Sequence, residues 1–263
     1  LRIKPLTTAR TKAVMPTDFS GLPADVPAIR RALGTRNIKI VRDASHSFGS
    51  KINNRMVGVA TGEDITCLSF DPIKNLTCGE GGAILLKDAA AADNLRCQKM
   101  IGMKRTTWQS LSKKTVEDRR VVQQGFRYHM SNINAAIGLV QMGRFKKSVA
   151  RRQMLAKLYD RLFAKSNNVR ILKRNYNAIA PFMYIIRVSS KCRDDLIDYL
   201  GENGIHAGLR YYPCHLQPFF SHRGRALPVT EMVAQEMLSI PLFPALTVQQ
   251  VRFVVSKINA FFK

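Results

Sequence analysis

Residues 69–82 read SFDPIKNLTCGEGG and follow directly on a β-rich run, Ile65–Leu68. The run predicts a strand that ends near Ser69, and the glycines predict a backbone that a ligand can approach closely. A hydroxyl at a strand end, a lysine five residues on and a flexible glycine run suit a phosphate-bearing cofactor. A lysine in such a pocket loses its proton readily and can form a Schiff base with an aldehyde, so Lys74 is a candidate catalytic residue.

A plainer interpretation of Lys74 stays open. The chain contains 42 lysines and arginines, and most of them must be solvated. The segment has neither the G-x-x-x-x-G-K-[ST] pattern of a Walker loop nor G-x-G-x-x-G. Composition by itself favours a surface lysine.

A second strand, predicted at 38–42, ends at Asp43. Ligands of open α/β sheets bind outside the carboxyl ends of the strands, so a carboxylate at this place is well positioned to meet one. The alternative is an aspartate that only caps a turn or a helix.

Strand patterns alternate with helix patterns over the first part of the chain, which predicts an α/β fold with a mostly parallel sheet. The expected strands lie at 11–16, 38–42, 65–70 and 82–86, and the expected helices at 24–33 and 89–100. A long helix is predicted from 131 to 163, after a basic connection at 102–124 that is too long for an ordinary turn. The chain therefore divides into a large domain, 1–143, and a second part, 144–263, that holds most of this helix and a small α+β domain. In the small domain we expect a strand at 182–188 and helices at 193–203 and 248–262.

Composition and charge narrow the class of protein. A chain of 263 residues with 46% hydrophobic residues can bury a core, which excludes wholesale disorder. No apolar run approaches the roughly 20 residues of a spanning helix, so no membrane partner is expected. The five cysteines are scattered without a C-x-x-C pair, which predicts a reducing cytoplasm and no metal site. The formal net charge of +24 attracts polyanions and phosphorylated small molecules.

Several segments, in order along the chain, resemble the DegT/DnrJ/EryC1/StrS family of nucleotide-sugar aminotransferases, which depend on pyridoxal 5'-phosphate (PLP). The matching segments are VRDASHSFG at 41–49, residues 69–82, GFRYHMSNINAAIGL at 125–139, YYPCHLQPFF at 211–220 and LSIPLFP at 238–244. The resemblance implies the type I, aspartate aminotransferase-like fold of PLP-dependent transferases, N-terminally truncated.

The same resemblance implies roles for five residues. Lys74 carries the cofactor and moves the proton during transamination, and Asp43 pairs with the pyridinium nitrogen. His46 stands near the phenolic oxygen of the ring, and Ser69 holds the phosphate. Arg127 replaces an asparagine that reaches the phosphate in the neighbouring subunit. An arginine there is either a stronger phosphate ligand or too long to fit.

The implied reaction has two halves: an amino donor, glutamate in most of the family, leaves its amine on the cofactor, which then aminates a keto-sugar nucleotide for polysaccharide biosynthesis. Family members that dehydrate instead have histidine in place of Lys74. His215, in a loop that lies near the substrate in the family, is a weaker candidate for substrate contact. The remaining histidines, His129, His206 and His222, have no metal-ligand spacing. The family's active site lies at a dimer interface, so a homodimer is implied.

The match begins within the family's large domain, without its N-terminal phosphate loop. We therefore expect a fragment, a chain completed by a separately encoded N-terminal piece, or a catalytically decayed relative. The last of these would be a non-catalytic protein that binds polyanions through its basic surface. Nucleic acid is not the partner that we favour.

Overall fold

A computed structural model describes residues 3–59, 61–103, 120–220 and 226–263. The chain forms two compact units. The first holds residues 1–18 and 23–143, and the second holds residues 19–22 and 144–263. Most of the predicted basic connection at 102–124 lies outside the described residues.

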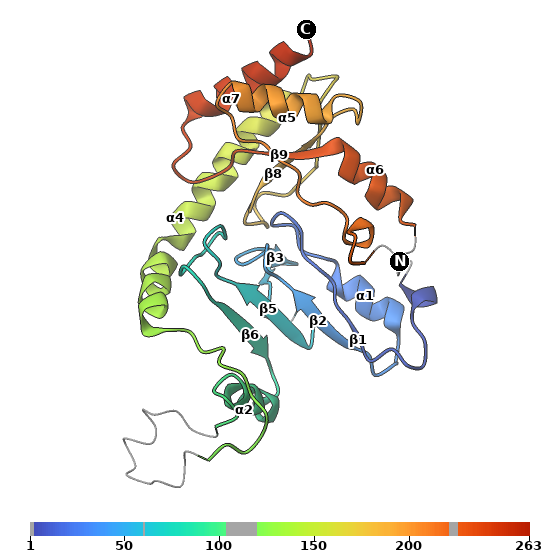
Figure 1. Ribbon diagram of the computed structural model, residues 1–263, viewed down its shortest axis with the longest axis vertical. Coiled ribbons are helices and arrows are strands. Elements are labelled where there is room, and N and C mark those ends of the chain that lie inside the picture. Colours follow the sequence, from blue (N-terminus) through green and yellow to red (C-terminus); the bar gives the residue numbers. More distant parts are fainter. Residues whose placement is uncertain (1–2, 60, 104–119, 221–225) are drawn as a thin grey trace. The chain divides into compact units, whose positions relative to one another are not determined.

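The first unit is built on a four-stranded sheet in the order β1-β2-β5-β6, which Figure 1 shows side by side. The strands are β1 (Ala13–Val14), β2 (Lys39–Asp43), β5 (Ile65–Ser69) and β6 (Gly82–Leu86). The pairs β1–β2 and β2–β5 are parallel, as expected, whereas β5 and β6 run antiparallel. All four predicted strands are therefore confirmed, although β1 is much shorter than its predicted span of 11–16.

Two helices of this unit also match their predicted positions. They are α1 (Val26–Leu33) and α2 (Ala89–Gln98). Each begins at an aspartate whose carboxylate accepts a backbone hydrogen bond in the first turn, Asp25 from Ala28 at 2.9 Å and Asp88 from Ala91 at 3.0 Å. A short 3-10 helix, η1 (Lys4–Leu6), precedes them. The apolar face of α1 packs on β2 through a core of Val26, Leu33, Ile38 and Ile40.

A small hairpin in this unit has no counterpart among the predicted strands. It pairs β3 (Lys51–Ile52) with β4 (Arg55–Met56). Asn53 and Asn54 join the strands with φ angles of +48° and +63°, the geometry of a type I′ turn. Asparagine tolerates this conformation, but two-residue strands are too short to show an alternating pattern.

The long helix α4 (Asn132–Phe163) confirms the predicted helix at 131–163 and belongs to both units. Its second half contributes Leu155, Leu158, Tyr159 and Phe163 to the core of the second unit. Arg152 is buried there and donates to the carbonyl groups of Phe182 and Leu242. Burial lowers the pKa of Arg152 to about 10.

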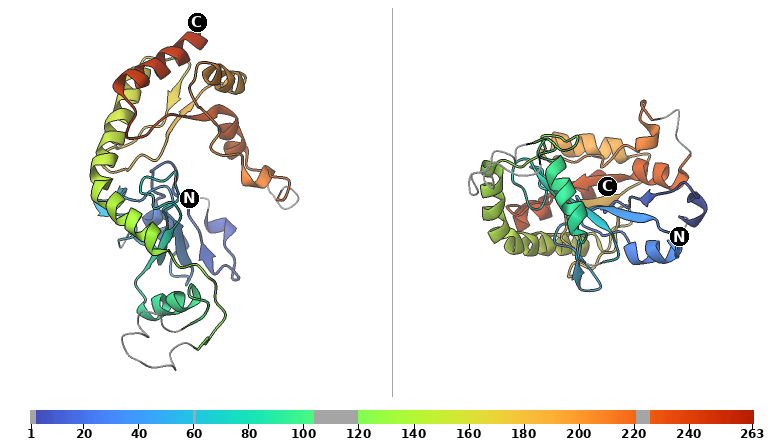
Figure 2. Two further views of the ribbon diagram at one scale, coloured as in Figure 1. Left: turned by 60° about the vertical axis from the view of Figure 1, so that its left-hand side comes forward. Right: turned by 90° about the horizontal axis from the view of Figure 1, so that it is seen from below.

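The second unit is an α+β domain, as predicted. Its antiparallel sheet has the order β7-β8-β9, with β7 (Arg170–Ile171), β8 (Tyr184–Arg187) and β9 (Met237–Ile240). The helices are α5 (Arg193–Glu202), α6 (Pro228–Glu236) and α7 (Val248–Phe261), with a 3-10 turn, η3 (Cys214–Leu216). Figure 2 shows α5 beside α7, where the rings of Tyr199 and Phe261 lie 5.4 Å apart. The sequence prediction had missed β7, β9 and α6. Within the described ranges, no helix has both the length and the apolar character to cross a bilayer.

Candidate functional site

The predicted site residues of the first unit gather where β2 and β5 end. These strands are parallel neighbours, with Asp43 at the end of β2 opposite Cys67 of β5. Ser69 ends β5 two residues later and lies opposite Gly82 of β6. Since parallel strands end at the same edge of a sheet, Asp43 and Ser69 share one edge, as expected from the sequence.

Asp43 is held firmly at this edge. Its N–H donates to the Pro16 carbonyl and its carbonyl accepts from the Asp18 N–H, both at 2.9 Å. One carboxylate oxygen accepts from the N–H of Ser45 at 3.0 Å and from its hydroxyl at 2.6 Å. The Asp43 residue is half-buried. Burial of the Cys67 thiol raises its pKa, and the negative charge of Asp43 raises it further. The interpretation as a mere turn aspartate is thus partly correct, because Asp43 does organise the following turn.

Lys74 lies on the loop after β5, where its N–H donates to the Asp71 carbonyl at 3.0 Å. Burial lowers the pKa of its amine, and the carboxylates of Asp71 and Asp43 partly offset this effect. Lys74 is thus a half-buried amine within electrostatic reach of Asp43. Its setting differs from that of the solvated surface lysine that composition favours.

The loop that carries Lys74 is fixed at both ends. The N–H of Phe70 donates to the Gly81 carbonyl at 2.8 Å, and the Asn134 side chain donates to the Glu80 carbonyl at 2.7 Å. A Cβ at Gly82 would lie 2.6 Å from the Leu68 carbonyl oxygen, so strand pairing itself requires glycine there. Sequence reasoning had linked the glycine run to a ligand and had given Asn134 no role. The Ser131-x-x-Asn134 spacing at the start of α4 was the available signal.

The other cofactor candidates occupy different surroundings. Ser69 presents a hydroxyl that accepts weakly from the Asp71 N–H at 3.4 Å. His46 is half-buried on the turn that follows Asp43. Arg127 is exposed and forms an isolated antiparallel bridge with Met100, just beyond α2. The proposed phosphate contact of Arg127 stays a prediction.

His215 belongs to the second unit and has a partner within it. Its Nε2 lies 2.9 Å from a carboxylate oxygen of Glu231, which also accepts from the Leu227 N–H at 2.7 Å. The hydrogen bond from His215 lowers the pKa of Glu231. Contact with a substrate stays a prediction for His215. His222 lies outside the described residues, and those that are described hold no cluster of three groups able to bind a metal.

The described residues suit PLP chemically. Lys74 offers an amine that burial biases toward the neutral form, which is the form that attacks an aldehyde. Asp43 offers a carboxylate for a protonated ring nitrogen, and Ser69 a hydroxyl for a phosphate.

Comparison with known proteins agrees with this chemistry. The family model of the DegT/DnrJ/EryC1/StrS aminotransferases matches residues 1–259. Among solved structures, the aminotransferase TlmJ from Streptoalloteichus hindustanus is 29% identical, with a TM-score of 0.86 over 97% of this chain and 67% of its own.

Two further structures extend the comparison. A DegT/DnrJ/EryC1/StrS aminotransferase from Brucella abortus is 28% identical, with a TM-score of 0.81 over 95% of this chain and 64% of its own. Spr1654 from Streptococcus pneumoniae, solved in a PMP-form, is 22% identical and shares the fold, with a TM-score of 0.85 over 98% of this chain and 71% of its own. The chain thus spans about two thirds of the length of each.

Proposed function

Because the chain belongs to the DegT/DnrJ/EryC1/StrS aminotransferase family, whose members use PLP, we propose that it transfers an amino group to a keto-sugar nucleotide through Lys74. One observation carries this proposal. The half-buried amine of Lys74 has a lowered pKa and lies within electrostatic reach of Asp43, at the edge where β2 and β5 end. An amine that burial biases toward its neutral form can attack the aldehyde of PLP, and a carboxylate in the same site can hold a proton on the ring nitrogen.

Each residue at this edge has a distinct proposed task. Bound PLP supplies a ring that draws electrons away from the carbon losing its proton. Asp43 holds the proton on the ring nitrogen, which keeps the ring electron-withdrawing. Ser69 would donate a hydrogen bond from its hydroxyl to the phosphate, and His46 would lie beside the ring.

Lys74 has two tasks in this proposal. It holds the cofactor covalently before the amino donor arrives, and its released amine then carries a proton between substrate and cofactor carbons. An amine with a lowered pKa suits both tasks, because it must be neutral to attack and must exchange its proton near neutral pH.

We propose glutamate as the donor and a nucleotide-linked keto-sugar as the acceptor. The net charge of +24 favours binding of a diphosphate group. Arg127 as a phosphate ligand and His215 as a substrate contact belong to the same proposal.

We also propose a homodimer. The first half of α4 leaves several large apolar side chains uncovered, among them Ile133 and Leu139 at 75% and 76% exposure. Uncovered apolar side chains gathered on one helix support a protein interface. Light scattering on the purified chain measures the molar mass.

Borohydride trapping tests the proposed function. The purified chain is incubated with PLP, reduced, digested and mapped by peptide mass. Reduction turns the carbon–nitrogen double bond between cofactor and lysine into a stable amine. We expect one dominant adduct, on Lys74, that disappears in Lys74→Ala. Its yield is expected to rise with pH and to level off below pH 10.5, the ordinary pKa of lysine, since burial lowers the pKa of Lys74.

Two comparisons make the trapping specific. Asp71→Asn removes a carboxylate that raises the pKa of Lys74, so the yield should level off at still lower pH. Labelling spread over many lysines and unchanged in Lys74→Ala would contradict the proposal. That result would favour the alternative of a non-catalytic, polyanion-binding protein.

A further inference from the structure

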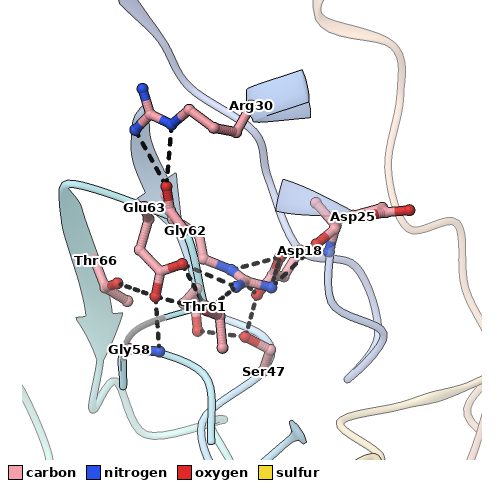
Figure 3. Close-up of polar contacts among 12 residues, drawn as sticks. Asp18, Asp25, Arg30, Ser47, Gly58, Thr61, Gly62, Glu63 and Thr66 are labelled. Carbon is pink, nitrogen blue, oxygen red and sulfur yellow. Dashed lines mark hydrogen bonds and ion pairs between the residues drawn. The ribbon is translucent and has the colours of Figure 1, made fainter. Parts of the chain in front are cut away.

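A buried ionic network lies directly behind Asp43, on the opposite face of β2. Arg42 is completely buried, and its guanidinium binds the Asp18 carboxylate with two parallel contacts, Nε–Oδ2 at 2.9 Å and Nη2–Oδ1 at 3.0 Å. On its other side, Nη1 lies 3.7 Å from Glu63 and 3.2 Å from the Thr61 hydroxyl. Figure 3 shows Asp18, Ser47, Thr61 and Glu63 around this centre.

The network contacts both ends of the turn that follows β2, residues 43–47. The Asp18 N–H donates to the Asp43 carbonyl, and the Asp18 carboxylate accepts from the hydroxyl of Ser47, four residues further along. Asp18 therefore closes a ring of contacts around residues 43–47, the segment that carries both Asp43 and His46. Ser47 is fully buried, so no water competes for its hydroxyl.

A contribution to folding stability does not by itself explain why the chain has a buried ionic network at this place. Apolar side chains of similar volume are often as stabilising as a buried ion pair, because both charges lose their hydration. Bidentate arginine–carboxylate contacts do, however, fix geometry more strictly than apolar packing. A fixed turn is what the proposed task of Asp43 demands, because its carboxylate would have to face the ring nitrogen of bound PLP.

We propose that Asp18, held by Arg42 and linked to the turn through Ser47, is the positioning residue that sets the orientation of Asp43 at the PLP site. This inference rests on the proposed function for its ligand, but the ordering of the turn is a property of the chain without ligand. Asp18 acts through Asp43 and needs no contact with the cofactor.

Ser47→Ala tests the proposal with little disturbance, because it removes one hydroxyl and leaves the Arg42–Asp18 pair intact. Thr61→Val is the matched control: it removes a hydroxyl from the same network that contacts Arg42 and Glu63 instead of the turn. Two quantities are measured on the full chain. One is hydrogen exchange of the amides at 44–50 without PLP, and the other is the dissociation constant of PLP from its absorbance change.

We expect Ser47→Ala to speed exchange of these amides and to weaken PLP binding by about tenfold, the range for a lost hydrogen bond to a charged group. Thr61→Val should leave both quantities within about twofold of the original chain, as expected for a contact away from the turn. Equal behaviour of the two variants in both measurements would overturn the positioning role.

A failure of the proposed function looks different. If the original chain binds no PLP, the proposed function fails, while the exchange measurement still decides whether Asp18 and Ser47 order the turn. If the original chain binds PLP and Ser47→Ala binds it equally well with unchanged exchange, only the positioning role fails.

Discussion

Replacing Lys74 by alanine is expected to slow the first half of the reaction, amino transfer from glutamate to bound PLP, by about 10³-fold or more, the range associated with loss of a positioned acid–base group. The variant loses the amine that moves the proton and the amine that holds the cofactor. The measurement is the rate at which PLP bound to the chain is converted by glutamate, followed by absorbance in a single turnover.

The matched control is Lys87→Ala. Lys87 is exposed and directly follows β6, the strand that continues from the loop of Lys74, and its loss should leave the rate unchanged. Added small amines should partly restore the rate of Lys74→Ala, because a free amine can carry the proton, whereas they cannot repair a misfolded chain. Activity of Lys74→Ala within tenfold of the original chain would exclude the proposed role.

The ends of the strands could be predicted because short-range patterns specify them. A β-rich run that stops at a polar residue marks Asp43 and Ser69. A mostly parallel sheet was predicted from the strand–helix alternation of the first part of the chain as a whole, and β2 and β5 are parallel although the described residues between them form the hairpin β3–β4. The proximity of Lys74 to Asp43 could not be derived from spacing, since 31 positions separate them. It came from the family resemblance.

The network behind Asp43 escaped prediction for a different reason. Arg42 lies between Val41 and Asp43, where a charged side chain indicates a solvent-facing position. In the structure it is fully buried because Asp18, 24 positions earlier, supplies its counter-charge. Such a pair is visible only after the chain has folded, since neither residue marks the other in the sequence.

The antiparallel pairing of β6 with β5 was also not predicted from the sequence. The alternation of strands and helices favours parallel pairing, but only the loop of Lys74 joins β5 to β6, and no helix crosses over between them. The loop leaves and re-enters the sheet at one edge, where the Phe70 N–H donates to the Gly81 carbonyl, so β6 returns antiparallel to β5. The glycine-rich loop was interpreted as a ligand site, and its second role as a strand connection was overlooked.

Replacing Arg42 by methionine is expected to lower the free energy of unfolding by about 3–5 kcal/mol, the cost of leaving buried carboxylates without their cation. Asp18 is fully buried and Glu63 nearly so, and neither can recover water without opening the sheet. Urea denaturation followed by circular dichroism measures the change. Arg96→Met is the control, because the Arg96–Asp93 pair is exposed and such pairs contribute about 0–1 kcal/mol.

The double variant Arg42→Met/Asp18→Asn separates the charge from the packing. If the loss in Arg42→Met comes from an unpaired carboxylate, neutralising Asp18 should recover part of it, and the double variant should lose less than the two single variants together. Strict additivity would instead assign the loss to packing around the Arg42 side chain. A loss in Arg42→Met no larger than that in Arg96→Met would show that the buried pair contributes no more than an exposed one.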